Sequence, residues 1–163
     1  MSPQFDAKPL ETQEAAFSYP LIRLIEPSTR LEDWRLFVQD LNARRNRSRR
    51  ARGGVIVVDS RDYIHGMFCY RIASGLYGDG LLAVDRVIVV DNFLCAGATK
   101  TLIRALETVA HTLFCSKIDI ELPREWTSYP QPANGIFHLL KRAGYRRSNT
   151  CMTKTMDNAR ATV

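Results

Sequence analysis

Asp85 is the one acidic residue in the apolar stretch LLAVDRVIVV, which runs from Leu81 to Val90. The stretch has the length and composition of a buried strand. Burial of a carboxylate raises its pKa and allows it to accept a proton near neutral pH. Asp85 is therefore our first choice for a general base or an acceptor-binding group. The alternatives are an ion pair with Arg86 at a bulge and a residue that faces outward.

The turn that follows this strand is built from small residues, CAGATK, from Cys95 to Lys100. Small side chains let an anion approach the N–H groups at a helix N terminus, where the helix dipole also favours negative charge. A Walker loop is excluded because Leu94 and Thr99 stand where it needs glycines. A dinucleotide fingerprint is excluded because only Gly97 is present. A pyrophosphate site and a tightly packed turn without a ligand both remain open.

An arginine tract, RRNRSRRAR, extends from Arg44 to Arg52. It holds six arginines and no acid, whereas the formal net charge of the whole chain is +6, so the remaining residues are balanced. Three interpretations stay open: a solvated connector, a surface for an acidic acceptor, and a nucleic-acid contact. The absence of interleaved aromatic residues and of a second equally dense basic cluster disfavours nucleic acid.

The composition predicts an ordinary globular protein. The 163 residues suit a single domain, and no apolar run approaches the roughly 20 residues that span a bilayer. The N-terminal segment has no apolar signal-peptide core, which makes the cytoplasm the expected location. The three histidines show no metal-ligand spacing, so we expect no metal.

Hydrophobic periodicity predicts a mixed order of strands and helices. We expect residues 1–17 to form a flexible arm and residues 157–163 a loose tail. Strands are predicted at Tyr19–Ile25, 55–60, 63–74, 81–90 and 117–122, with a final strand or strand pair near 145–156. Helices are predicted from about residue 31, from 97 to about 114, and over residues 133–144. The helix at 97–114 would cross between two parallel neighbouring strands.

This order of elements, with the small turn at this place, resembles the GCN5-related N-acetyltransferase (GNAT) family over roughly residues 19–156. The family signature [QR]-x-x-G-x-[GA] falls on the residues from Leu94 to Thr99. Gly97 matches the central glycine, whereas Leu94 replaces Gln or Arg and Thr99 replaces Gly or Ala. A second echo is ANGIFHLLKRAGYRR, in which Gly144-Tyr145 stands where Gly-Phe is usual.

The resemblance implies a single α/β (α+β) domain over residues 1–163, with a mixed central sheet of about six to seven strands flanked by helices. Acetyl-CoA would enter where the strands 81–90 and 117–122 splay apart. The backbone near Val89 and Val90 would pair with the pantetheine arm. The N–H groups of the following turn would hold the pyrophosphate, at Cys95, Ala96, Gly97, Ala98, Thr99 and Lys100.

The resemblance further implies direct attack of a primary amine on the thioester, with Asp85 as the base. Leu140 stands where many members carry a proton-donating tyrosine. Either the thiolate leaves unaided or another group donates the proton, and Tyr129 is our choice for that acid. Tyr145 and His138 are alternatives. A degenerate CoA-binding or interaction module is the competing interpretation of the chain. The acceptor would be a small-molecule or peptide amine, with an acidic acceptor as one option, and a homodimer is an expectation of the family.

Overall fold

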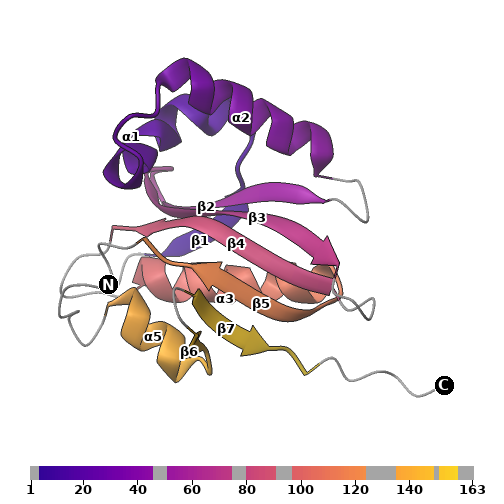
Figure 1. The fold of residues 1–163 in the computed structure, drawn as a ribbon. Helices are drawn as coiled ribbons and strands as arrows, with labels where there is room; N and C mark the ends of the chain where they lie inside the picture. The colour runs from indigo at the N-terminus through magenta and orange to yellow at the C-terminus, as the bar shows by residue number, and fades with distance from the viewer. Residues whose placement is uncertain are drawn as a thin grey trace.

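The computed structural model describes residues 4–45, 51–74, 80–90, 97–123, 135–148 and 151–157. A seven-stranded sheet with the order β1-β2-β3-β4-β5-β7-β6 forms the centre of the molecule (Figure 1). The neighbours β4 and β5 are parallel, and every other neighbouring pair is antiparallel. The mixed α/β sheet that the sequence predicts is therefore confirmed.

The strands and helices have the following bounds. The strands are β1 (Phe5–Pro9), β2 (Arg52–Asp59), β3 (Ile64–Ser74), β4 (Gly80–Val89), β5 (Cys115–Glu121), β6 (Arg146–Ser148) and β7 (Cys151–Thr155). The helices are the short η1 (Thr12–Glu14), α1 (Ala15–Ile25), α2 (Leu31–Arg44), α3 (Gly97–Thr112) and α5 (Ile136–Arg142).

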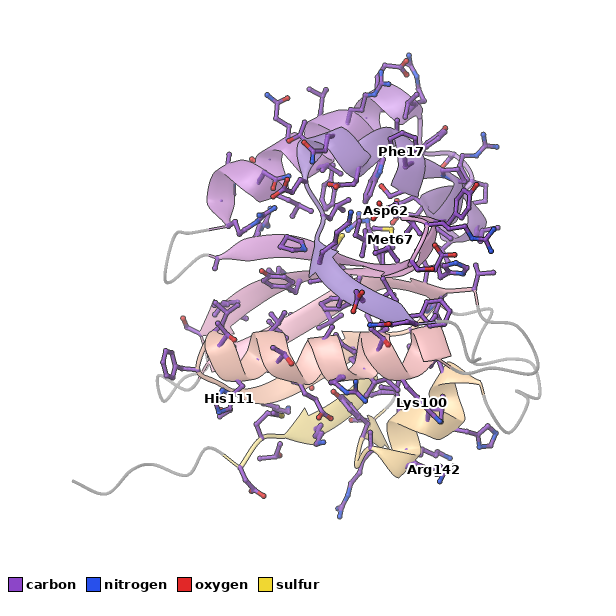
Figure 2. The ribbon with its side chains drawn as sticks, turned by 180° about the vertical axis from the view of Figure 1, so that it is seen from behind. Phe17, Asp62, Met67, Lys100, His111 and Arg142 are labelled. Atoms are coloured by element: carbon purple, nitrogen blue, oxygen red, sulfur yellow. The ribbon has the colours of Figure 1, made fainter. Side chains whose placement is uncertain are left out.

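Helices cover both faces of the sheet, with α1 and α2 on one face and α3 and α5 on the other (Figure 1). The alternation of side chains along β2 explains why both faces need cover. Val55 and Val57 belong to the core beneath α3, whereas Ile56 and Val58 belong to the core beneath α1 and α2. Met67 of β3 likewise lies between the sheet and the two N-terminal helices (Figure 2).

Two predictions for the N-terminal part are wrong. Residues Tyr19–Ile25 were expected to form a strand, but they are the second part of helix α1. Its buried residues are Ala15, Ser18, Leu21 and Ile22, which is helical spacing, and Pro20 lies inside the helix. The expected flexible arm over residues 1–17 instead contains β1, which pairs with β2 from Phe5–Asp59 to Pro9–Val55.

The other predicted elements are confirmed with small shifts at their ends. Helix α3 runs from β4 to the parallel strand β5, as a crossover connection requires. Its apolar face packs on the sheet through buried residues that include Leu102 and Leu106. The tail at 158–163 lies outside the described residues. Within the described part of the chain, no helix has the length and apolar character needed to cross a membrane.

One buried hydrogen bond joins the two helices on the α1/α2 face. Trp34 Nε1 of α2 donates to Ser18 Oγ of α1 at 3.0 Å, and Ser18 Oγ donates to the Ala15 carbonyl at 3.1 Å. Trp34 is 2% exposed and Ser18 is fully buried. Removal of the Ser18 hydroxyl would therefore leave a buried indole N–H without an acceptor.

We expect Ser18→Ala to lower the free energy of unfolding by about 1–3 kcal/mol for this reason. Thermal denaturation should show a melting temperature several degrees lower. The double variant Ser18→Ala/Trp34→Phe has no unpaired donor, so its loss should be smaller than the sum of the two single losses. Additive losses would contradict this role for the hydrogen bond.

Candidate active site

Strands β4 and β5 pair along only part of their length. Their parallel ladder runs from Gly80–Cys115 to Val84–Ile120, whereas β4 continues to Val89. Within the described residues, the β5-facing edge of β4 beyond Val84 has no strand beside it. This edge offers backbone N–H and C=O groups to an extended ligand, which can add to it as another strand would.

The direction of the backbone groups identifies which residues face this open edge. Val90 N–H donates to the His65 carbonyl of β3 at 2.7 Å. In an antiparallel pair the backbone groups of successive residues point alternately toward and away from the partner strand. Val89, opposite Gly66, therefore directs its N–H and C=O away from β3 and toward the open edge. Of the two residues predicted to pair with pantetheine, Val89 has this geometry, whereas the N–H of Val90 is already used.

Helix α3 begins at Gly97, a few residues after the open edge of β4. Ala98 and Thr99 are buried, at 0% and 1% exposure, whereas Lys100 is exposed near the start of the helix (Figure 2). The first turn of a helix carries the positive end of the dipole, and Lys100 adds a full positive charge. Cys95 and Ala96, which were also predicted to bind the cofactor, lie outside the described residues.

A β-bulge shapes the middle of β4. Met67 pairs with Ile88 and Cys69 pairs with Asp85, so β4 carries one extra residue between these two pairs. Arg86 occupies the bulge with a φ of 49°, in the left-handed region that non-glycine residues rarely adopt. Such strain and such bulges concentrate at functional sites.

Asp85 and Arg86 form the ion pair that we kept as an alternative for Asp85. Arg86 Nη1 lies 3.1 Å from Asp85 Oδ2, and Arg86 Nε lies 3.0 Å from Glu26 Oε1 at the C-terminal end of α1. The guanidinium also lies 4.5 Å from the ring centroid of Phe37 of α2. Arg86 thus ties both N-terminal helices to the bulge and holds Asp85 in place.

An acidic cavity of about 280 Å³ lies between the bulge of β4 and the C-terminal ends of α1 and β5. Its charged lining consists of Glu26, Asp85, Arg86 and Glu121. Burial raises the pKa of the Asp85 carboxyl above its ordinary value of 3.8, and the charge of Glu121 raises it further. Arg86 and Arg71 act in the opposite direction, but the net pKa shift is upward. Asp85 is therefore poised to take up a proton more readily than an exposed aspartate.

A second cavity, of about 140 Å³, lies between α2 and the strands β3 and β4. It shares Asp85 and Arg86 with the acidic cavity, and its other charged lining residues are Arg52 and Arg71. We call it the basic cavity. Asp85 and Arg86 thus stand between an acidic and a basic cavity on the α1/α2 side of the sheet.

The structure narrows the choice of proton donor. Leu140 is fully buried in the core. Tyr145 is 2% exposed, and burial, together with the charge of Glu107, raises the pKa of its phenol. Glu107 lies ten residues after Gly97 along α3, or roughly 15 Å from the N terminus of the helix, so Tyr145 is remote from the open edge. Tyr129 lies outside the described residues.

Sequence reasoning missed three charged residues of the two cavities. Glu26 was placed after a strand, although it follows the last residue of α1. Glu121 and Arg71 lie at alternating positions of predicted strands, which is the ordinary pattern of a solvated face. Only the pairing of the strands brings them toward Asp85. Within the described ranges, no cluster of side chains suits a metal ion.

The protein resembles known proteins in its structure and not in its sequence. No family model and no curated protein matches the sequence. A spermidine N-acetyltransferase chimera involving the Vibrio cholerae enzyme superposes with a TM-score of 0.68 at 15% identity, over 93% of this chain and 95% of that one. Glucosamine-6-phosphate N-acetyltransferase from Arabidopsis thaliana gives 0.65 at 14% identity, over 94% and 99% of the two chains. An aminoglycoside N-acetyltransferase in complex with CoA gives 0.62 at 13% identity, over 78% and 82%.

The chain therefore has the GNAT acyl-CoA N-acyltransferase fold. At these identities the likeness establishes the fold alone. It confirms the resemblance that the order of elements and the turn at Gly97 suggested.

Proposed function

We propose that this chain is an acetyl-CoA-dependent N-acetyltransferase that transfers the acetyl group to a primary amine by direct attack. The observation that carries the proposal is the early end of the β4–β5 ladder at Val84–Ile120, which leaves the Val89 edge open. The proposal is further supported by structural neighbours that are N-acetyltransferases, one of them in complex with CoA.

In this proposal the cofactor uses the open edge and the start of α3. Backbone groups of Val89 pair with the pantetheine arm, and the first turn of α3, from Gly97 through Lys100, faces the pyrophosphate. Acetyl-CoA supplies an activated acyl group as a thioester. Val89 and the first turn of α3 would together direct that thioester toward the acidic cavity on the α1/α2 side.

The chemistry assigned to the protein is a proton transfer at Asp85. The amine nitrogen forms a bond to the carbonyl carbon, the carbon–sulfur bond breaks, and the thiolate departs with the electron pair. Asp85 takes the proton from the amine, directly or through a water. We assign protonation of the thiolate to Tyr129, the proton donor that the sequence suggests, which lies outside the described residues.

The experiment that tests this proposal measures release of free CoA thiol from acetyl-CoA with a panel of primary amines. The panel includes an alkylamine, spermidine and glucosamine 6-phosphate. We expect amine-dependent thiol release above the hydrolysis rate and an acetylated product in the mass spectrum. Absence of saturable acetyl-CoA binding at high micromolar concentration would contradict the cofactor assignment.

The second candidate is a CoA-binding module without turnover. It is favoured by Leu140, which is fully buried and carries no proton to donate. Such a module would bind acetyl-CoA in calorimetry, yet no amine would accelerate thiol release. The same panel of amines therefore separates the two candidates.

A further inference from the structure

Two arginines face each other on the sheet next to Asp85. Arg52 of β2 pairs directly with Arg71 of β3. The neighbouring N–H of Ile72 donates to the Ala51 carbonyl at 3.0 Å, which makes Arg52–Arg71 a non-hydrogen-bonded pair. Cα atoms in such pairs are only about 4.5 Å apart, so the two side chains leave the sheet close together.

Like charges at directly opposite positions of a sheet destabilise it. The described surroundings compensate this pair only in part. Arg52 Nη1 lies 3.9 Å from Asp40 Oδ2 of α2, and Asp40 is already bonded by Arg44 at 2.9 Å. Arg71 is exposed and forms no ion pair with the described residues, and its charge acts on Asp85 only at longer range. An anion bound between the two guanidinium groups would remove the repulsion.

The position of this pair connects it to the proposed chemistry. Arg52 and Arg71 line the basic cavity together with Asp85 and Arg86. The basic cavity carries three arginines and one carboxylate, whereas the acidic cavity carries three carboxylates and one arginine. Negative charge therefore gathers in the acidic cavity and positive charge in the basic cavity, and Asp85 lines both.

We infer that the acceptor carries an anionic group besides its reactive amine, and that Arg52 and Arg71 bind this group while the amine lies at Asp85. The part concerning the amine rests on the proposed function. Arg71 lies two residues from Cys69, the partner of Asp85 across the ladder, which is a step of roughly 7 Å along the strand. The acceptor is thus a zwitterion with its charges several ångströms apart.

Three probes with the same number of carbons, five, test the acceptor class: 5-aminopentanoate, pentylamine and 1,5-diaminopentane. They carry an anionic, a neutral and a cationic group at the end remote from the reacting amine. We expect kcat/KM for acetyl transfer to fall in that order. Preference for the diamine over 5-aminopentanoate would overturn the inference while leaving the acetyltransferase assignment intact.

The variant Arg71→Gln tests whether Arg71 binds the anionic group of the acceptor. It should raise KM for 5-aminopentanoate about ten-fold relative to KM for pentylamine, because a charge-assisted hydrogen bond is lost. The influence of Arg71 on the pKa of Asp85 acts on both amines alike, so it cancels in this ratio. Arg71→Lys should restore part of the loss. Arg35→Gln removes the same charge from an exposed position of α2 and serves as the matched control. An equal loss for both amines would identify Arg71 as merely structural.

Inorganic phosphate provides a readout that does not need turnover. In thermal denaturation, phosphate should stabilise the wild type and Arg35→Gln but not Arg71→Gln. If phosphate stabilises all three proteins equally, the anion site is refuted even where no amine is acetylated. Failure of acetyl-CoA to bind, with this phosphate effect intact, would refute the proposed function instead.

Discussion

Replacement of Asp85 by asparagine is expected to lower kcat/KM for acetyl transfer by about 10²- to 10⁴-fold, the range typical for loss of a general base. The amide cannot take the proton from the amine. For the wild type, kcat/KM should rise with pH through the pKa of Asp85, which burial places above 3.8. Asp85→Asn should lack this acidic limb. Steady-state kinetics across pH, with acetyl-CoA saturating, measures both effects.

Stability separates this result from simple unfolding. Because folding raises the pKa of Asp85, its ionisation costs folding free energy, and the cost grows as pH rises from the unfolded to the folded pKa. Asp85→Asn removes the cost, and Arg86 keeps its contact with Glu26. The variant should therefore melt no lower than the wild type at neutral pH. Asp157→Asn, at an exposed position, is the matched control. Full activity of Asp85→Asn would exclude the base role.

Replacement of Val89 by proline is expected to weaken acetyl-CoA binding by about ten-fold or more. Proline removes the N–H that points to the open edge and places a ring where pantetheine would lie. The β3–β4 ladder should survive, because this N–H does not face β3 and proline is tolerated on the open side of a strand. Calorimetric titration with acetyl-CoA gives the dissociation constant.

Two variants control for the change of side chain and for the position. Val89→Ala shortens the side chain but keeps the N–H, so it should bind acetyl-CoA nearly as the wild type does. Val90→Pro removes the N–H that bonds to the His65 carbonyl, so it should lower the melting temperature instead. Undiminished affinity of Val89→Pro would rule out strand-like pairing of the cofactor at this edge.

The local spacing of apolar and polar residues was sufficient to predict most of the helices and strands. The spacing of apolar residues in the single sequence is enough to predict the apolar face of α3 and the strand β2. The strand predicted at Tyr19–Ile25 was wrong because Pro20 and the apolar run around it hid a helical pattern. That pattern becomes visible when Ala15 and Ser18 are counted with Leu21 and Ile22. Strand β1 is short and mixed in composition, and only its pairing with β2 makes it a strand.

The candidate site was predictable only where it depends on a local anomaly. Asp85 stood out because a carboxylate interrupts an apolar strand, and the structure places it at a bulge beside a cavity. Glu26 and Arg71 could not be found in this way. Their contribution arises from contacts between elements distant in sequence, and such contacts have no local signature. Arg52 belonged to a conspicuous tract, yet strand pairing alone singles it out among the arginines.

The central claim is that acetyl-CoA occupies the open edge of β4 and the start of α3. Hydrogen exchange of the full chain, with and without saturating acetyl-CoA, tests this most directly. We predict slower exchange in peptides that cover residues 85–90 and 97–101, and no change in the paired strands β1 and β2. Unchanged exchange at both segments under saturating acetyl-CoA would contradict the account.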